Sequence, residues 1–214
     1  MKPLNKYIQE KLIINKDYRE AKIVVKSFDE LRNIIEDRYD KLGPGTKQDP
    51  IDFNDIDVSN IDSFCDNDDN GLFEKTKFKY IDISDWDTSS VTNMLSMFYK
   101  CNELKSVGDI SYWDVSNVTN MAYMFTGCSN LNQDISRWNV SLVTDMSYMF
   151  FGCENFNQNI SSWDVSKVAD MCSMFKFCRS FNQDLSKWNI SKVKNNILMF
   201  ENCPIKEEYK PKFK

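Results

Sequence analysis

Most of this chain repeats one pattern of apolar and polar positions about every 25 residues. Tryptophans at positions 86, 113, 138, 163 and 188 mark the repeats, and one repeat reads DISRWNVSLVTDMSYMFFGC. In each repeat a Val follows the Trp by five positions, a Phe by twelve and a Cys by fifteen. A unit this short cannot bury its apolar face alone, so we expect the repeats to stack. The positions expected to form a buried structural ladder are Trp86, Trp113, Trp138, Trp163, Trp188, Cys101, Cys128, Cys153, Cys178 and Cys203.

Each repeat contains two short segments with a clear periodicity. Residues 131–135 alternate apolar and polar side chains, as do 156–160 and 181–185, which predicts short strands. Residues 118–125 place apolar side chains at i, i+3, i+6 and i+7, which predicts a helix of one to two turns with Asn120 as its N-cap. Together they predict an α/β repeat solenoid with a short strand and a short helix in each 25-residue turn.

The segments outside the repeats carry different patterns. Ser27 and Glu30 form a capping-box sequence before an amphipathic stretch that Gly43 ends, which predicts a helix over 28–42 after a strand over 21–25. We therefore expect an N-terminal helical cap over 21–55 and a solenoid of one eroded and five regular repeats over 56–203. Residues 204–214 are a C-terminal cap or a frayed tail. Residues 1–20 predict a leader helix, either part of the cap or a separate docking helix.

The repeat resembles a known family. The pattern FNQ-D/N-I/L-S-x-W-D/N-V-S-x-V-T-x-M-x-x-M-F-x-x-C, over roughly residues 53–203, looks like the signature of the BspA-like branch of the leucine-rich repeat proteins. That resemblance implies a leucine-rich-repeat-like fold and a surface for adhesion or protein binding, often on exported, surface-anchored proteins. The opening LNKYIQEKLIINKD also looks like a segment shared by proteins of gut-bacterial phages, which implies a bacterial or phage origin.

Composition narrows the function classes. None of the 214 residues is His, which removes the usual general base and the commonest zinc ligand, and no Gly-rich phosphate loop is present. We therefore expect neither an enzyme nor a cofactor. The net charge of −5 disfavours nucleic acid as a partner. No apolar run reaches 18 residues and no signal peptide opens the chain. We expect no membrane insertion and a cytoplasmic location, or the host cytoplasm or a virion for a phage protein.

Two features imitate metal sites. Asp66, Asp68 and Asn70 match the opening of a calcium-binding loop, but position 12 is Lys77 where a bidentate Glu is needed, so we expect a solvated insertion. The in-register cysteines lack Cys-x-x-Cys spacing, so we expect packed thiols and no metal. Cys65 and Cys172 lie outside that series and are the candidates for exposure.

Paired amides recur at 132–133, 157–158 and 182–183. These Asn-Gln pairs have two interpretations. They form a polar recognition stripe, or their side chains bond to backbone groups of adjacent turns because buried amides must be satisfied.

A binding surface is expected where the repeats differ from one another. The position before each Trp and the positions around the Met-Phe pair change from repeat to repeat. Aromatic side chains flanked by charges are typical of interface cores with a polar rim. The pattern favours a non-catalytic scaffold that binds a protein, or else a glycan, through one side of the solenoid. The alternative is a structural or virion component docked through its N-terminal segment. The candidate binding residues are Tyr112, Tyr123, Arg137, Tyr148, Phe151 and Lys187.

Overall fold

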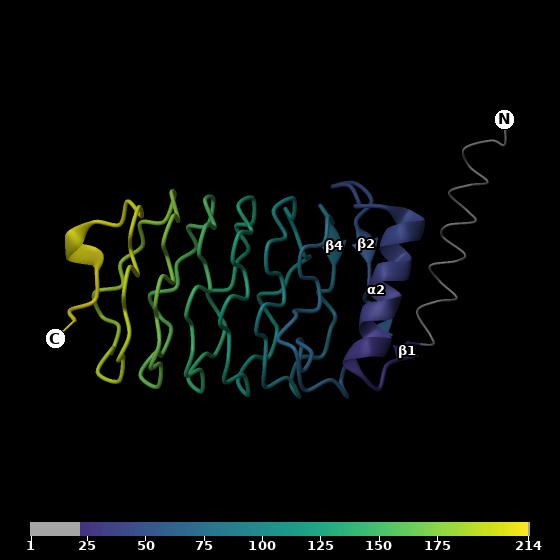
Figure 1. Cartoon of the computed structure of the whole chain (residues 1–214), viewed down its shortest axis with the longest axis horizontal. Coiled ribbons are helices and arrows are strands. Elements are labelled where there is room, and N and C mark those ends of the chain that lie inside the picture. The colour runs from purple at the N-terminus through teal and green to yellow at the C-terminus, as the bar shows by residue number, and fades with distance from the viewer. Residues whose placement is uncertain (1–21, 214) are drawn as a thin grey trace.

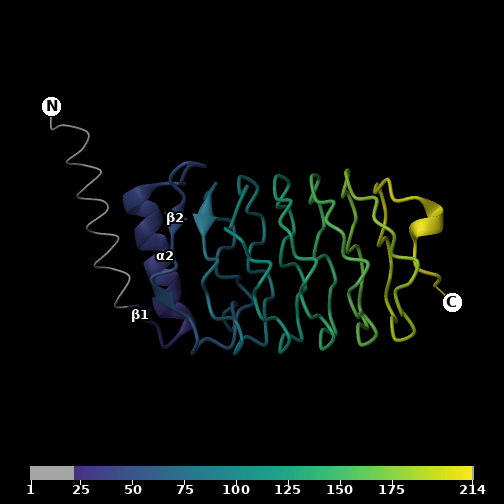
Figure 2. The ribbon, with the colours of Figure 1, turned by 180° about the vertical axis from the view of Figure 1, so that it is seen from behind.

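The computed structural model describes residues 22–213, and the predicted leader helix over 1–20 lies outside the described residues. In Figure 1 the chain advances along one long axis, from the N-terminal elements at one end to the C-terminal segment at the other. Successive segments of about 25 residues lie side by side in chain order, and Figure 2 shows the same order from behind. We call each of these segments a turn.

One α-helix is present among the described residues. It is α2, Phe28–Leu42, and its predicted bounds are confirmed. Ser27 Oγ accepts a hydrogen bond of 3.2 Å from the Glu30 backbone N–H, as a capping residue does. Gly43 ends the helix in a left-handed conformation with φ of 74°, which glycine adopts without strain. The helix lies across the N-terminal end of the row of turns (Figure 1). Its buried side chains are Leu31 and Ile35.

Four strands of two residues each form two parallel pairs. β1 (Ile23–Val24) pairs with β3 (Ile56–Asp57), and β2 (Ile51–Asp52) pairs with β4 (Ile81–Asp82). β1 lies within the strand predicted over 21–25. A short 3-10 helix, η1 (Glu207–Tyr209), lies near the C-terminal end.

The predicted α/β repeat solenoid, with a strand and a helix in every turn, is wrong. The described residues contain one α-helix and four short strands in two small sheets, and no strand lies beyond Asp82. Residues 118–125 form no helix because Tyr123 takes a left-handed φ of 58°, which cannot continue a right-handed helix. The same conformation recurs in neighbouring turns, at Ser96, Tyr148, Ser173 and Leu198.

The strands predicted over 131–135, 156–160 and 181–185 are also absent. The alternation of apolar and polar residues in these segments reflects burial alone, because Leu131 and Ile135 lie in the core and Asn132 is exposed. Amide side chains provide hydrogen bonds between these segments. Asn132 Oδ1 accepts from the Asn157 backbone N–H at 3.0 Å, and Gln158 Nε2 donates to Asn132 O at 3.0 Å. The Asn-Gln pairs therefore bond to the backbone of adjacent turns.

Backbone hydrogen bonds join each turn to the next. The N–H groups of alternate residues, Met121, Tyr123, Phe125 and Gly127, donate to Asp145 O, Ser147 O, Met149 O and Phe151 O at 2.7–3.0 Å. The side-chain Oδ1 of Asn120, the predicted capping residue, accepts a hydrogen bond from the Ala122 N–H at 2.9 Å. This bond closes a short bend of the backbone and does not begin a helix.

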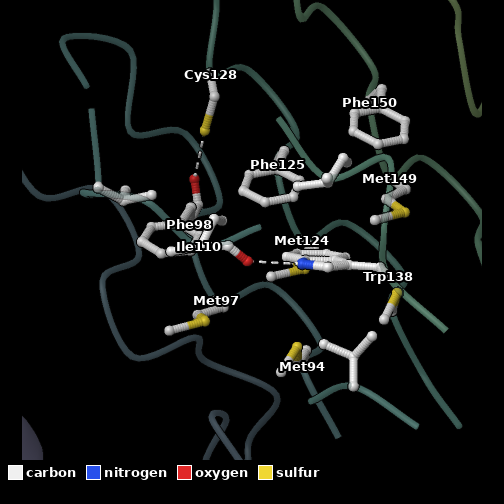
Figure 3. Close-up of a cluster of buried hydrophobic side chains, with 14 of the residues drawn as sticks. Met94, Met97, Phe98, Ile110, Met124, Phe125, Cys128, Trp138, Met149 and Phe150 are labelled. Atoms are coloured by element: carbon white, nitrogen blue, oxygen red, sulfur yellow. Dashed lines mark hydrogen bonds between the residues drawn. The ribbon is translucent and has the colours of Figure 1, made fainter. Parts of the chain in front are cut away.

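The core is one continuous cluster that extends from Val25 to Ile205. The rings of Phe98, Phe125 and Phe150 stack along the axis, with centroids 5.5 and 5.9 Å apart. Figure 3 shows two further contacts between turns. Trp138 Nε1 donates to Ile110 O at 2.9 Å, and Cys128 Sγ donates to Phe98 O at 3.1 Å. All five ladder tryptophans are buried, as are four of the ladder cysteines, whereas Cys203 is half-buried.

Candidate binding surface

The six candidate binding residues fall into two groups. Tyr112, Arg137 and Lys187 each precede a Trp, and all three are exposed. The Arg137 guanidinium lies 5.0 Å from the ring centroid of Tyr112 in the adjoining turn, and Lys187 lies two turns beyond Arg137. An exposed cation–π pair contributes only about 0.5–1 kcal/mol. This group presents one aromatic ring, which is 73% exposed.

Tyr123, Tyr148 and Phe151 form the second group and are in contact. The rings of Tyr123 and Tyr148 stack with centroids 4.7 Å and planes 5° apart, and the Phe151 ring lies 5.8 Å from that of Tyr148. Two residues absent from the predicted set extend this group. Tyr99 packs edge-on against Tyr123 at 6.1 Å, and Phe177 packs edge-on against Phe151 at 5.5 Å. We call these five half-buried residues, which come from four consecutive turns, the aromatic strip.

The strip is a local departure from the repeat. Tyr123 and Tyr148 occupy a left-handed position that is Ser96 and Ser173 in the flanking turns. A bulky residue in that conformation carries about 1–3 kcal/mol of backbone strain. The two tyrosine rings are therefore stacked at a site where the backbone is strained. Phe177 stands at the position of Gly127 and Gly152 in the preceding turns. The sequence analysis missed Phe177, although an aromatic residue where the repeat has Gly is a signal that identifies it.

Lysines border the strip at both ends. Lys100 Nζ lies 4.9 Å and Lys75 Nζ 5.9 Å from the ring centroid of Tyr99. At the other end, Lys176 Nζ lies 5.3 Å from the Phe177 centroid and also pairs with Glu201. Aromatic faces bordered by ammonium groups suit a partner with an apolar centre and carboxylates around it.

The hydroxyls of Tyr123 and Tyr148 remain protonated at neutral pH. Burial raises the pKa of Tyr123. The hydrogen bond between the Tyr148 hydroxyl and Cys172 Sγ, 3.7 Å long, favours the protonated phenol and raises the pKa of Tyr148. These two phenol groups are therefore uncharged over the physiological range and serve as hydrogen-bonding groups.

The two cysteines expected to be exposed lie differently. Cys65 is buried, which contradicts the prediction, and Ser63 Oγ and Asn93 Nδ2 lie 3.3 and 3.1 Å from its Sγ. Cys172 is half-buried beside Tyr148.

The loop that imitates a calcium site closes on itself. Asp66 Oδ1 accepts hydrogen bonds from the backbone N–H groups of Asp68 and Asn70, and Oδ2 accepts one from Asn70 Nδ2 at 2.9 Å. Between residues 22 and 213, no group of three or more His, Cys, Asp or Glu side chains converges in a way that suits a metal ion. That part of the chain also has no helix with the length and apolar character needed to cross a membrane.

These features define a repeat protein whose recurring residues build the core and whose variable residues form the surface. The model of one family, described as "Mycoplasma protein of unknown function, DUF285", matches residues 67–155 and 104–210. The matched residues make up more than half of the chain, which therefore belongs to the DUF285 family. No curated protein and no solved structure matches the chain.

Proposed function

We propose that this chain is a non-catalytic scaffold that binds a protein through the aromatic strip. One observation carries the proposal, namely that five aromatic rings from four turns are in contact where the repeats differ in sequence. Aromatic side chains bury a large area with few rotatable bonds and dominate the energetics of many interfaces.

The way the strip is held supports this proposal. The N–H groups of Tyr123 and Tyr148 donate to Ser147 O and Cys172 O of the next turn at 2.9 and 2.8 Å, so the backbone beneath the rings is tied down. A surface ordered before binding loses little conformational entropy on association. Contact among the rings orders their side chains in the same way.

The sequence supports the same class of function. The resemblance to BspA-like repeat proteins implies a surface used for adhesion or protein binding. The ladder thiols do not favour an enzyme, because burial raises the pKa of Cys128 and Cys178 well above the ordinary value and keeps these groups protonated.

The test uses variants that the repeat itself supplies. Replacing Tyr123 and Tyr148 with Ser, and Phe151 with Thr, installs the residues that occupy the equivalent positions 96, 173 and 126. Unlike alanine substitutions, these side chains already occur at those places in folded turns. The control is Tyr112→Ser/Arg137→Ser, which removes the exposed aromatic residue and cation of the first group.

The experiment is affinity capture from a lysate of the encoding organism, followed by calorimetry with the purified partner. We expect the strip variant to bind at least about 30-fold more weakly than the parent, because interface hot spots contribute about 2 kcal/mol or more. The control should bind like the parent, and both variants should keep a cooperative thermal transition. Loss of the partner in the control but not in the strip variant would contradict the proposal, as would a turnover activity abolished by one polar substitution.

A further inference from the structure

One set of backbone hydrogen bonds between turns has a common direction. In each of four successive turns, four alternate N–H groups donate toward the C-terminal end of the row, as Met171, Ser173, Phe175 and Phe177 do to Asn195 O, Ile197 O, Met199 O and Glu201 O. In an ordinary parallel sheet both edges of a strand present alternating donors and acceptors. Here the same edge of each turn presents N–H groups alone at these four positions.

The turn that contains residues 196–202 leaves its donors open. The equivalent N–H groups are those of Asn196, Leu198, Phe200 and Asn202, and none of them has an acceptor within residues 22–213. We call these four groups the donor edge. Aligned N–H groups without acceptors carry partial positive charge and attract anions and carbonyl oxygens.

Apolar and basic side chains surround the donor edge. The Ile197 and Leu198 residues are 64% and 49% exposed, whereas the equivalent positions in the preceding turn are half-buried or buried. A groove of about 400 Å³ lies in the same turn. Its lining includes Trp188, Ile190, Val193, Lys194, Asn196 and Lys212.

Charge is distributed unevenly along the molecule, and the C-terminal end is the more basic one. Residues 160–213 contain 9 Lys and Arg against 6 Asp and Glu, whereas residues 22–90 contain 9 against 17. The end that bears the donor edge is therefore basic within an acidic protein. Backbone donors and side-chain charges there both favour an acidic ligand.

We propose that the donor edge binds an extended acidic peptide segment of a partner protein. Carbonyl and carboxylate oxygens of the segment accept from the four N–H groups, Lys194 and Lys212 face its carboxylates, and Ile197 and Leu198 contact its apolar side chains. A second copy of this chain stacked end to end is the poorer fit, because α2 lies across the opposite end of the row (Figure 1). This surface is separate from the aromatic strip.

The test uses a fluorescein-labelled peptide of alternating Glu and Val, with capped ends, and a Lys-Val peptide as its counterpart. We expect the Glu-Val peptide to bind the full chain and the Lys-Val peptide not to bind. At saturation, amide hydrogen exchange at Asn196, Leu198, Phe200 and Asn202 should slow at least about tenfold. Binding that leaves these four amides unprotected would overturn the proposal, as would no binding of the Glu-Val peptide.

Matched variants separate the site from general electrostatics. Lys194→Glu/Lys212→Glu should weaken peptide binding at least about tenfold, whereas Lys47→Glu/Lys105→Glu, which changes the net charge equally at a different groove, should change it less than about threefold. Equal weakening by both pairs would overturn the proposal. So would concentration-dependent self-association that protects the same amides without peptide. The strip variant should keep peptide binding, so failure of this proposal is distinguishable from failure of the proposed function.

Discussion

A buried thiol in each turn is the most regular chemical feature at the level of single residues. Cys101 is representative, because its Sγ donates to Phe73 O at 2.8 Å and only 1% of the residue is exposed. Burial raises the pKa of Cys101 from 9.0 to about 11. The folded protein therefore holds a proton that the unfolded chain releases at lower pH.

This difference predicts a loss of stability in alkali. The contribution of Cys101 is fully present below about pH 9 and is lost as the pH rises from 9 to about 11, because the unfolded state then binds fewer protons. One such group contributes a slope of about −1.4 kcal/mol per pH unit. Cys101→Ala should reduce the slope of the free energy of unfolding against pH by that amount between pH 9 and about 11. Urea unfolding at several pH values under reducing conditions measures this slope. An unchanged slope in the variant would contradict a buried, protonated thiol.

At the level of elements, α2 is attached to the row of turns by Arg38. Its two Nη atoms donate to the two carboxylate oxygens of Asp55 at 2.7 Å each, and Nη1 also bonds to Asp52 O. The guanidinium lies 5.2 Å from the ring centroid of Phe53. Both partners of the ion pair are largely buried, with side chains 17% and 22% exposed. Such a paired and partly desolvated charge contributes more than an exposed one.

Removing this attachment should destabilise the protein measurably. Arg38→Met should lower the free energy of unfolding by about 1–3 kcal/mol, because it leaves the Asp55 carboxylate and the Asp52 carbonyl without their donor. Lys41→Met on the same helix breaks only the exposed pair with Asp37 and should change the free energy by less than about 0.5 kcal/mol. Urea unfolding of the two variants gives the comparison. Equal effects would show that the docking of α2 does not depend on Arg38.

At the level of the whole molecule, one core runs from α2 to the last turns. Leu31 and Ile35 belong to the same cluster as Phe150 and Ile205, with no break between the cap and the repeats. A continuous core without a weak boundary favours a single cooperative unfolding transition.

Native-state hydrogen exchange tests this cooperativity. The amides of Ile35 in α2 and of Phe150, which donates to Met174 O at 3.0 Å, should converge on one opening free energy as denaturant is added. The amides of the donor edge should exchange far faster in the free protein. A lower opening free energy for Ile35 than for Phe150 would show that α2 unfolds by itself.

The sequence alone determined the recurring core positions of the repeats and where α2 lies, whereas the burial of Cys65 was predicted wrongly. Burial acts on each position separately, so the 25-residue periodicity identified the core residues Trp138, Phe125 and Cys128. The helix over 28–42 was predictable because its cap, its apolar stripe and its terminal Gly43 are local signals.

Only the tertiary structure decided the conformation of the turns and the contacts on the surface. An apolar spacing of i, i+3, i+6 and i+7 does not distinguish a helix from an irregular turn, because the left-handed Tyr123 is held by a hydrogen bond to Ser147 in the next turn. Tertiary structure likewise decided the ring contacts from Tyr99 to Phe177 and the shared orientation of the four N–H groups of the donor edge. They depend on how neighbouring turns are aligned, and bonds between residues about 25 positions apart set that alignment.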